Sequence, residues 1–134
     1  MKETTKKIII LVCIFVALNA VMALKYFQIK RLTESFPNDS IIGKGKPVLL
    51  ELGSRSCPPC IRMLPFLNEL NTEQTAFVVS YIDVWADNIK GNQYGVEITP
   101  TQIFFDGNGE QLFRHVGFYS KEEILDKWKQ LGVE

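Results

Sequence analysis

Cys57 and Cys60 are two thiols separated by two prolines, close enough in the chain for their sulfurs to meet. An apolar stretch typical of a buried strand ends shortly before them, and a helical pattern begins directly after Cys57. The amides and dipole at a helix N-terminus stabilise a thiolate, which is the form of cysteine that attacks a disulfide. The pair therefore predicts thiol–disulfide exchange, in which Cys60 resolves a mixed disulfide formed by Cys57.

The residues around this pair affect its thiolate in opposite ways. Pro58 is preorganised for the first helical position, but Pro58 and Pro59 both lack a backbone N–H. The loss of such a donor destabilises the thiolate and makes the pair more reducing. The positive charge of Arg55, two residues before Cys57, stabilises the thiolate. The sequence leaves open which effect dominates, and with it the direction of electron flow.

Metal binding is the alternative chemistry for two thiols at this spacing. Soft Cu(I) suits thiolate ligands, so a copper-delivery module is one alternative function. A structural zinc site needs four ligands, whereas the chain adds only one histidine, His115, in a stretch that alternates like a strand. We therefore predict no metal site and no cofactor other than the redox-active cysteine pair. A zinc site shared by two copies of the chain is a further alternative, and a structural adaptor is the simplest one.

Hydrophobic periodicity places the pair in a domain at 47–134 with the element order βαβαββα. Apolar runs predict the strands, three-residue apolar steps predict the helices, and the turn residues at 106–109 predict a hairpin. The predicted strands are 48–52, 77–83, 101–105 and 111–116, and the predicted helices are 58–70 with a kink at Pro65, 86–94, and a last helix capped by Ser120 and Glu123. This order predicts an α/β fold with two parallel crossovers, an antiparallel hairpin and helices on both sheet faces.

Residues 47–131 resemble the thioredoxin fold, in the form of membrane-tethered bacterial thioredoxin-like proteins. The resemblance rests on several residues at the spacing of that family: Cys57-Pro58-Pro59-Cys60 for its CxxC motif, Pro65 inside the active-site helix, Thr99-Pro100-Thr101 for its cis-proline loop, Gly117 after the last strand, and Glu51 for its buried acid. The resemblance implies a central mixed sheet with helices on both faces.

The resemblance also implies a role for each matched residue. Cys57 is expected to be the nucleophile and Cys60 the resolving thiol. A cis Pro100 is expected, with the backbone of Thr99 facing the incoming peptide and Gly117 keeping the substrate groove open.

Glu51 is expected, from the resemblance, to accept the proton of Cys60. Its position in an apolar strand independently predicts partial burial and a raised pKa, and an acid facing water is the alternative. The sequence also departs from the family. Ser56 stands where the family has a tryptophan before the first cysteine, which leaves the substrate contacts near Cys57 undefined, and the family's first strand and helix are replaced by a spacer at 28–46.

The N-terminal region predicts a membrane anchor. Residues 8–24 carry no charge, Tyr26 and Phe27 extend the stretch into the interface, and 8–27 is thus long enough for a transmembrane signal-anchor after a short cytoplasmic tail at 1–7. A signal peptide cleaved near 21–23 is the alternative. Three basic residues lie on each side of the stretch, and the very short tail favours an N-terminus inside the cytoplasm.

Composition narrows the function further. Residues 44–134 contain nine basic and twelve acidic side chains without a basic cluster, which excludes an electrostatic footprint for nucleic acid. We therefore expect a reductase of protein disulfides, tethered to a bacterial cytoplasmic membrane with its domain outside. Its expected partners are protein thiols and disulfides and, by the resemblance, a thiol-transferring integral membrane protein as electron donor. A disulfide-forming oxidant is the redox alternative.

Overall fold

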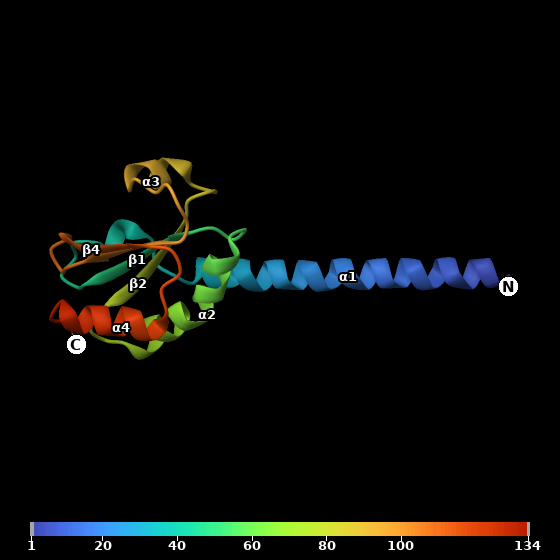
Figure 1. Ribbon diagram of the computed structural model, residues 1–134, viewed down its shortest axis with the longest axis horizontal. Helices are drawn as coiled ribbons and strands as arrows, with labels where there is room; N and C mark the ends of the chain where they lie inside the picture. The colour runs from blue at the N-terminus through green and yellow to red at the C-terminus, as the bar shows by residue number, and fades with distance from the viewer. Residues whose placement is uncertain (1, 134) are drawn as a thin grey trace.

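The structure, a computed structural model, describes residues 2–133, which form a mixed sheet with helices around it and one long helix that projects away (Figure 1). The observed elements begin with a long helix over the predicted N-terminal anchor and a short 3-10 helix, and they then follow the predicted order. They are α1 (Glu3–Glu34), the 3-10 helix η1 (Asp39–Ile41), β1 (Val48–Gly53), α2 (Pro58–Glu73), β2 (Val78–Asp83), α3 (Asn88–Gln93), β3 (Thr101–Phe105), β4 (Gln111–Val116) and α4 (Lys121–Gln130).

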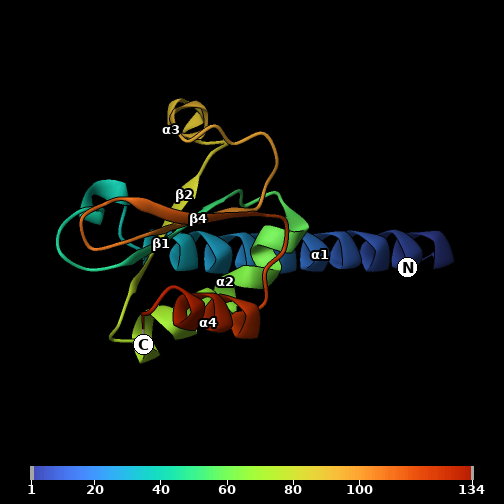
Figure 2. The same cartoon turned by 60° about the vertical axis from the view of Figure 1, so that its left-hand side comes forward.

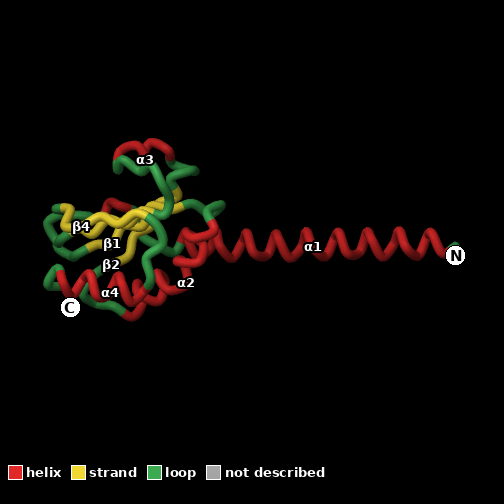
Figure 3. Tube along the Cα trace, viewed as in Figure 1, coloured by secondary structure: helices red, strands yellow, loops and turns green. Residues whose placement is uncertain are grey.

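The four strands form one sheet in the order β2-β1-β3-β4 (Figure 3). β1 runs parallel to β2 and antiparallel to β3, and β3 pairs antiparallel with β4. The prediction of two parallel crossovers is therefore wrong for the second one. α3 has six residues and a length of about 9 Å, whereas a six-residue strand spans about 20 Å. α3 therefore does not carry the chain back along the sheet, and β3 starts at the end where β2 finished.

The sheet separates two apolar layers of side chains. α2 and α4 cover the face with the larger layer, whereas η1 and the segment around α3 cover the other face (Figure 2). The larger layer includes Leu49, Leu64, Leu67, Phe104 and Trp128, and the smaller layer includes Leu50, Leu52, Ile82 and Ile103. All six residues of β1 are buried, and alternation along this strand directs Glu51 and Gly53 to the α2 side.

α1 is a continuous helix that includes residues 3–7 of the predicted tail, the predicted anchor and part of the predicted spacer. By length and composition it is able to cross a membrane, and its apolar stretch stands clear of the domain. The predicted spacer is anchored to the domain at a few residues: Ile29 contacts the larger apolar layer and Phe36 is buried in it. The carbonyl of Pro37 accepts hydrogen bonds from the Tyr81 amide (3.3 Å) and the Ser80 hydroxyl (2.9 Å). The division of the chain at 7, 27 and 46 stays a prediction.

Trp128 on α4 connects the last helix to the larger layer. Its ring stacks on Phe77 at 5.0 Å and packs against Phe104 at 4.6 Å between centroids, and the side chain is 1% exposed. We expect Trp128→Ala to lower the free energy of unfolding by about 3–5 kcal/mol, because it removes this contact and leaves a cavity. Urea unfolding followed by circular dichroism measures the change. The neighbouring exposed Lys129→Ala is the control and should change stability by less than about 0.5 kcal/mol.

Candidate redox site

Cys57 and Cys60 form a disulfide at the start of α2. Cys57 is the N-cap residue, and its sulfur accepts a hydrogen bond from the Cys60 amide at 3.4 Å. Pro58 and Pro59 occupy the first two helical positions and have no N–H to offer, so Cys60 supplies the donor. Cys57 is 7% exposed and Cys60 only 1%. Cys57 is therefore the more accessible of the two cysteines, and the attacking and resolving roles expected for Cys57 and Cys60 stay predictions.

The loop before β3 forms the opposite wall of the site. The Thr99–Pro100 peptide bond is cis, as the resemblance implies, and the Thr99 carbonyl oxygen lies 3.7 Å from the Cys57 sulfur. The Gly117 amide donates a hydrogen bond to the Pro100 carbonyl at 2.8 Å. Gly117 has a φ of +104°, and within residues 2–133 no atom lies within 4 Å of the position that a Cβ would take there. The space beside Gly117 is therefore open, and the substrate-binding roles of Thr99, Pro100 and Gly117 stay predictions.

Glu51 lies beneath the cysteines with its side chain fully buried, so the alternative of an acid in water is wrong. Burial raises the pKa of Glu51 to about 8, although the hydrogen bond from the Gln102 amide group at 2.9 Å works in the opposite direction. Two residues further along β1, a Cβ on Gly53 would lie 3.3 Å from the Cβ of Cys60. Glu51 is thus one pleat deeper than the strand position that touches Cys60. Its role as proton acceptor for Cys60 stays a prediction.

Two further polar groups near Glu51 were not predicted from the sequence. Gln102, opposite Glu51 on β3, also lies 3.7 Å from the Met63 sulfur of α2. Tyr81, opposite Glu51 on β2, places its ring 3.2 Å from a Cβ built on Gly53. Free oxygens of Glu51, Gln102 and Tyr81 are buried and find no hydrogen-bond partner within the described part of the chain. A single glutamine in the apolar run 101–105 was the available signal for this cluster.

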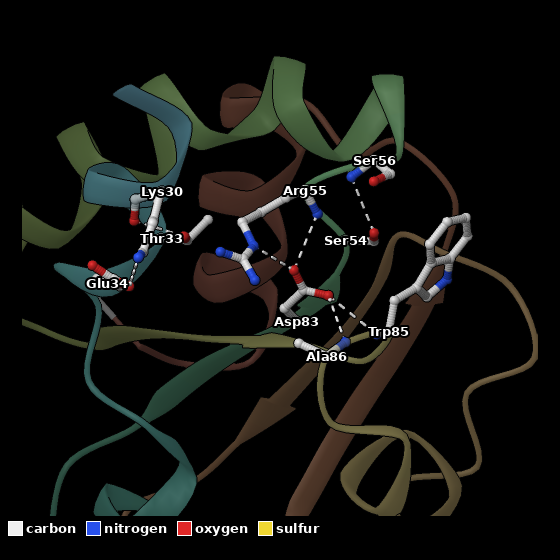
Figure 4. A network of polar contacts seen from close by, with 9 residues as sticks. All are labelled: Lys30, Thr33, Glu34, Ser54, Arg55, Ser56, Asp83, Trp85 and Ala86. Carbon is white, nitrogen blue, oxygen red and sulfur yellow. Dashed lines mark hydrogen bonds and ion pairs between the residues drawn. The ribbon is translucent and has the colours of Figure 1, made fainter. Parts of the chain in front are cut away.

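An ion pair fixes the loop that leads from β1 to Cys57. The Arg55 guanidinium donates to Asp83 at 2.8 Å, and the other Asp83 oxygen accepts the amides of Trp85 and Ala86 (Figure 4). Burial on its own would raise the pKa of Asp83, but these hydrogen bonds outweigh it and lower that pKa. The pairing reduces the field that Arg55 exerts at Cys57, because Asp83 supplies the opposite charge. The redox-tuning roles of Arg55, Pro58 and Pro59 stay predictions.

Trp85 is an exposed aromatic side chain near the redox site that was not predicted from the sequence. It follows β2 rather than preceding the first cysteine, and its side chain is 67% exposed. Trp85 lines one hollow together with Ser54 and Ser56, and a second hollow that reaches Thr99. Figure 4 shows it on the far side of Asp83 from α1, beside the Ser54–Ser56 turn. It therefore flanks both walls of the redox site.

His115, the histidine considered as a metal ligand, packs against an aromatic side chain. Its ring stacks on Tyr119 at 4.0 Å between centroids, and its Nε2 lies 3.3 Å from the Phe118 carbonyl oxygen. In the part of the chain that the structure describes, no group of three histidine, cysteine or acidic side chains is placed to hold a metal ion. The predicted lack of a metal and of any other cofactor stays a prediction.

The buried Glu51 makes stability depend on pH. Its pKa of about 8 in the folded chain exceeds the ordinary 4.5, so the folded chain retains a proton that the unfolded chain releases. This contribution is present below pH 4.5 and is lost as the pH rises through 8. Relative to Glu51→Gln, the wild type should lose on the order of 3–5 kcal/mol of unfolding free energy between pH 4 and pH 9. Urea unfolding at both pH values measures this difference, and the exposed Glu122→Gln should follow the wild type. Parallel curves for the wild type and Glu51→Gln would contradict the raised pKa.

Comparison with known proteins places this geometry in a family. A model of the thioredoxin-like domain matches residues 39–132. The chain is 33% identical over 102 residues to a thioredoxin of Mycobacterium bovis, a match that covers 75% of this chain and 86% of the relative. It is also 30% identical over 105 residues to protein disulfide-isomerase erp38 of Neurospora crassa, covering 75% of this chain and 28% of that longer protein.

Solved structures give the same result. A thioredoxin mutant from Halobacterium salinarum superposes with a TM-score of 0.61 at 29% identity, over 69% of this chain and 80% of the other. The exposed lipoprotein thioredoxin of Streptococcus pneumoniae superposes with a TM-score of 0.58 at 26% identity, over 66% of this chain and 87% of the other.

Proposed function

The chain belongs to the thioredoxin-like domain family, and from this premise we propose that it reduces protein disulfides outside the cytoplasmic membrane. Membership confirms the predicted resemblance to the thioredoxin family and its fold, whereas the membrane tether belongs to the proposal. Together with the Cys57–Cys60 disulfide it identifies the chain as a thiol–disulfide oxidoreductase that acts on protein thiols and disulfides. The direction of electron flow, the side of the membrane and the electron donor belong to the proposal.

The observation that carries the proposal is the position of the Cys57 sulfur, between the Cys60 amide and the Thr99 carbonyl. In the reduced protein, the Cys57 thiolate attacks one sulfur of a substrate disulfide and releases the first substrate thiolate. Cys60 loses its proton, with Glu51 as acceptor, and attacks the Cys57 sulfur of the mixed disulfide. The second substrate thiolate leaves, and the Cys57–Cys60 disulfide forms. Two electrons pass to the substrate, and its two thiolates take up protons.

The walls of the site supply the binding surface for that substrate. An extended segment on either side of the substrate cysteine runs past the Thr99 and Pro100 backbone, with Gly117 leaving room for it. Recognition through backbone groups is tolerant of sequence, which suits a reductase with several protein substrates.

α1 supports the proposed location. It is long and apolar enough to cross a membrane, and Lys2, Lys6 and Lys7 precede its apolar stretch. In the proposed orientation these lysines remain in the cytoplasm, and the domain lies outside. A domain outside the cytoplasm is separated from the cytoplasmic reductants, so we propose that a thiol-transferring membrane protein restores its dithiol.

The two cysteines should respond differently to substitution. We expect Cys57→Ser to abolish insulin disulfide reduction, by about 1000-fold or more, because it removes the attacking sulfur. Cys60→Ser should also stop turnover but accumulate a mixed disulfide between Cys57 and the substrate, visible on non-reducing gels. Cys13→Ser, a change in α1 far from the site, is the matched control and should retain full activity. Activity that persists in Cys57→Ser would contradict the mechanism.

The missing amides of the two prolines predict a reducing potential. Pro59→Ala restores an N–H in the first helical turn, so the Cys57 thiolate should become more stable and the pair more oxidising. Equilibration of the wild type and Pro59→Ala with glutathione or dithiothreitol measures both potentials. A wild-type potential near that of strongly oxidising disulfide donors would reverse the proposed direction, and the protein would then be a disulfide-forming oxidant.

A further inference from the structure

α1 leaves the domain at the end that carries the redox site. Figures 1 and 2 both place the green loop between β1 and α2 next to α1, on the side from which the helix projects. Tyr26 of α1 lines the same hollow as Ser54, Arg55 and Ser56, the three residues that precede Cys57. The loop before the nucleophile is therefore in the immediate surroundings of Tyr26.

The connection between the proposed membrane segment and the domain is rigid. The helix continues without a break from the proposed end of that segment, Phe27, to Glu34. Ile29, only two residues after Phe27, already packs on the larger apolar layer, and Phe36 is buried in it. A flexible tether would let the domain sample a range of heights, whereas this junction fixes the site near the level of Tyr26, which is the level of the bilayer surface.

The side chains at this end of the domain suit a lipid surface. Trp85 is 67% exposed and shares the hollow with Tyr26. Ile98 and Phe118, on the two loops that flank the cis proline, are 61% and 44% exposed. Tryptophan and tyrosine are the side chains that favour the bilayer interface. Three basic residues of α1, Lys25, Lys30 and Arg31, lie within about 8 Å of Tyr26 along the helix axis and match anionic headgroups.

We propose that the redox end of the domain rests on the phospholipid headgroups, with Trp85 inserted between them. The Cys57–Cys60 pair is then held at the membrane surface, and its preferred partners are cysteines that lie at that depth. This inference rests on the proposed membrane location of α1. It adds a fixed height for the site, a lipid contact for Trp85 and a restriction on which disulfides are reached.

The depth of Trp85 is measured with the full chain in phosphatidylcholine and phosphatidylglycerol vesicles whose acyl chains carry bromine, a quencher of tryptophan fluorescence. The chain has two tryptophans, and Trp128 is buried in the domain. We expect bromine to reduce the Trp85 emission, taken as wild type minus Trp85→Phe, by about twofold, as for an interfacial tryptophan. The emission of Trp85→Phe, which reports Trp128, should change little. Equal emission of Trp85 with and without bromine would overturn the lipid contact.

The height of the site is tested with one disulfide presented in two ways, on a lipid headgroup of the same vesicles and on a water-soluble peptide. We expect the wild type to reduce the headgroup probe at least about tenfold faster than the peptide, because both reactants are confined to the surface. Six Gly and Ser residues inserted between Phe27 and Gln28 break the rigid junction, and they should reduce this preference severalfold while the peptide is reduced at least as fast as before.

The possible outcomes distinguish a failure of the fixed height of the site from a failure of the proposed reductase function. Reduction of both probes at equal rates, or a preference that the insertion leaves unchanged, would overturn the fixed height but leave the redox function intact. Failure of the wild type to reduce either probe would contradict the proposed reductase itself. A full chain that does not float with the vesicles would contradict the membrane location and the lipid contact together.

Discussion

β1 makes a parallel ladder with β2 on one side and an antiparallel ladder with β3 on the other, and all six of its residues are buried. The rest of the site depends on this central strand. Its register sets Glu51 between Tyr81 and Gln102, and its end at Gly53 sets where the chain turns towards Cys57. A shift by one residue would direct Glu51 to the opposite apolar layer and move the cysteines with it. The ladders on both sides therefore position the redox pair.

The buried carboxyl of Glu51 lowers the stability of the fold. Glu51 and Gln102 form a single hydrogen bond inside an otherwise apolar layer. The second carboxyl oxygen of Glu51 and the amide oxygen of Gln102 have no partner among the residues described. Unpaired polar atoms in such surroundings destabilise a fold. A leucine at position 51 would fit the strand pattern better. The proposed role of Glu51 as proton acceptor for Cys60 would account for its presence, since a buried carboxyl with a pKa of about 8 is able both to accept and to release a proton.

The sequence was sufficient to predict what depends on local patterns. The strands, the helix with Pro65, and the capping box of Ser120 and Glu123 all lie where periodicity placed them. The family motifs located Cys57, Cys60 and Pro100, because those residues are tied to fixed spacings. The direction of β3 was missed, since it depends on how far the short α3 carries the chain. Gln102 and Trp85 were missed for a similar reason: only the paired strands and the folded loops reveal that they lie beside the site.

Because α1 is unbroken, the number of residues between the proposed anchor and Ile29 sets the orientation of the redox site about the helix axis. In an α-helix each residue adds about 1.5 Å of rise and about 100° of rotation. One extra residue between the anchor and Ile29 would leave the fold of the domain intact, yet it would turn the disulfide by about a quarter of a revolution around the helix axis. The number of residues in this segment thus determines the direction in which the Cys57–Cys60 disulfide faces around the helix axis.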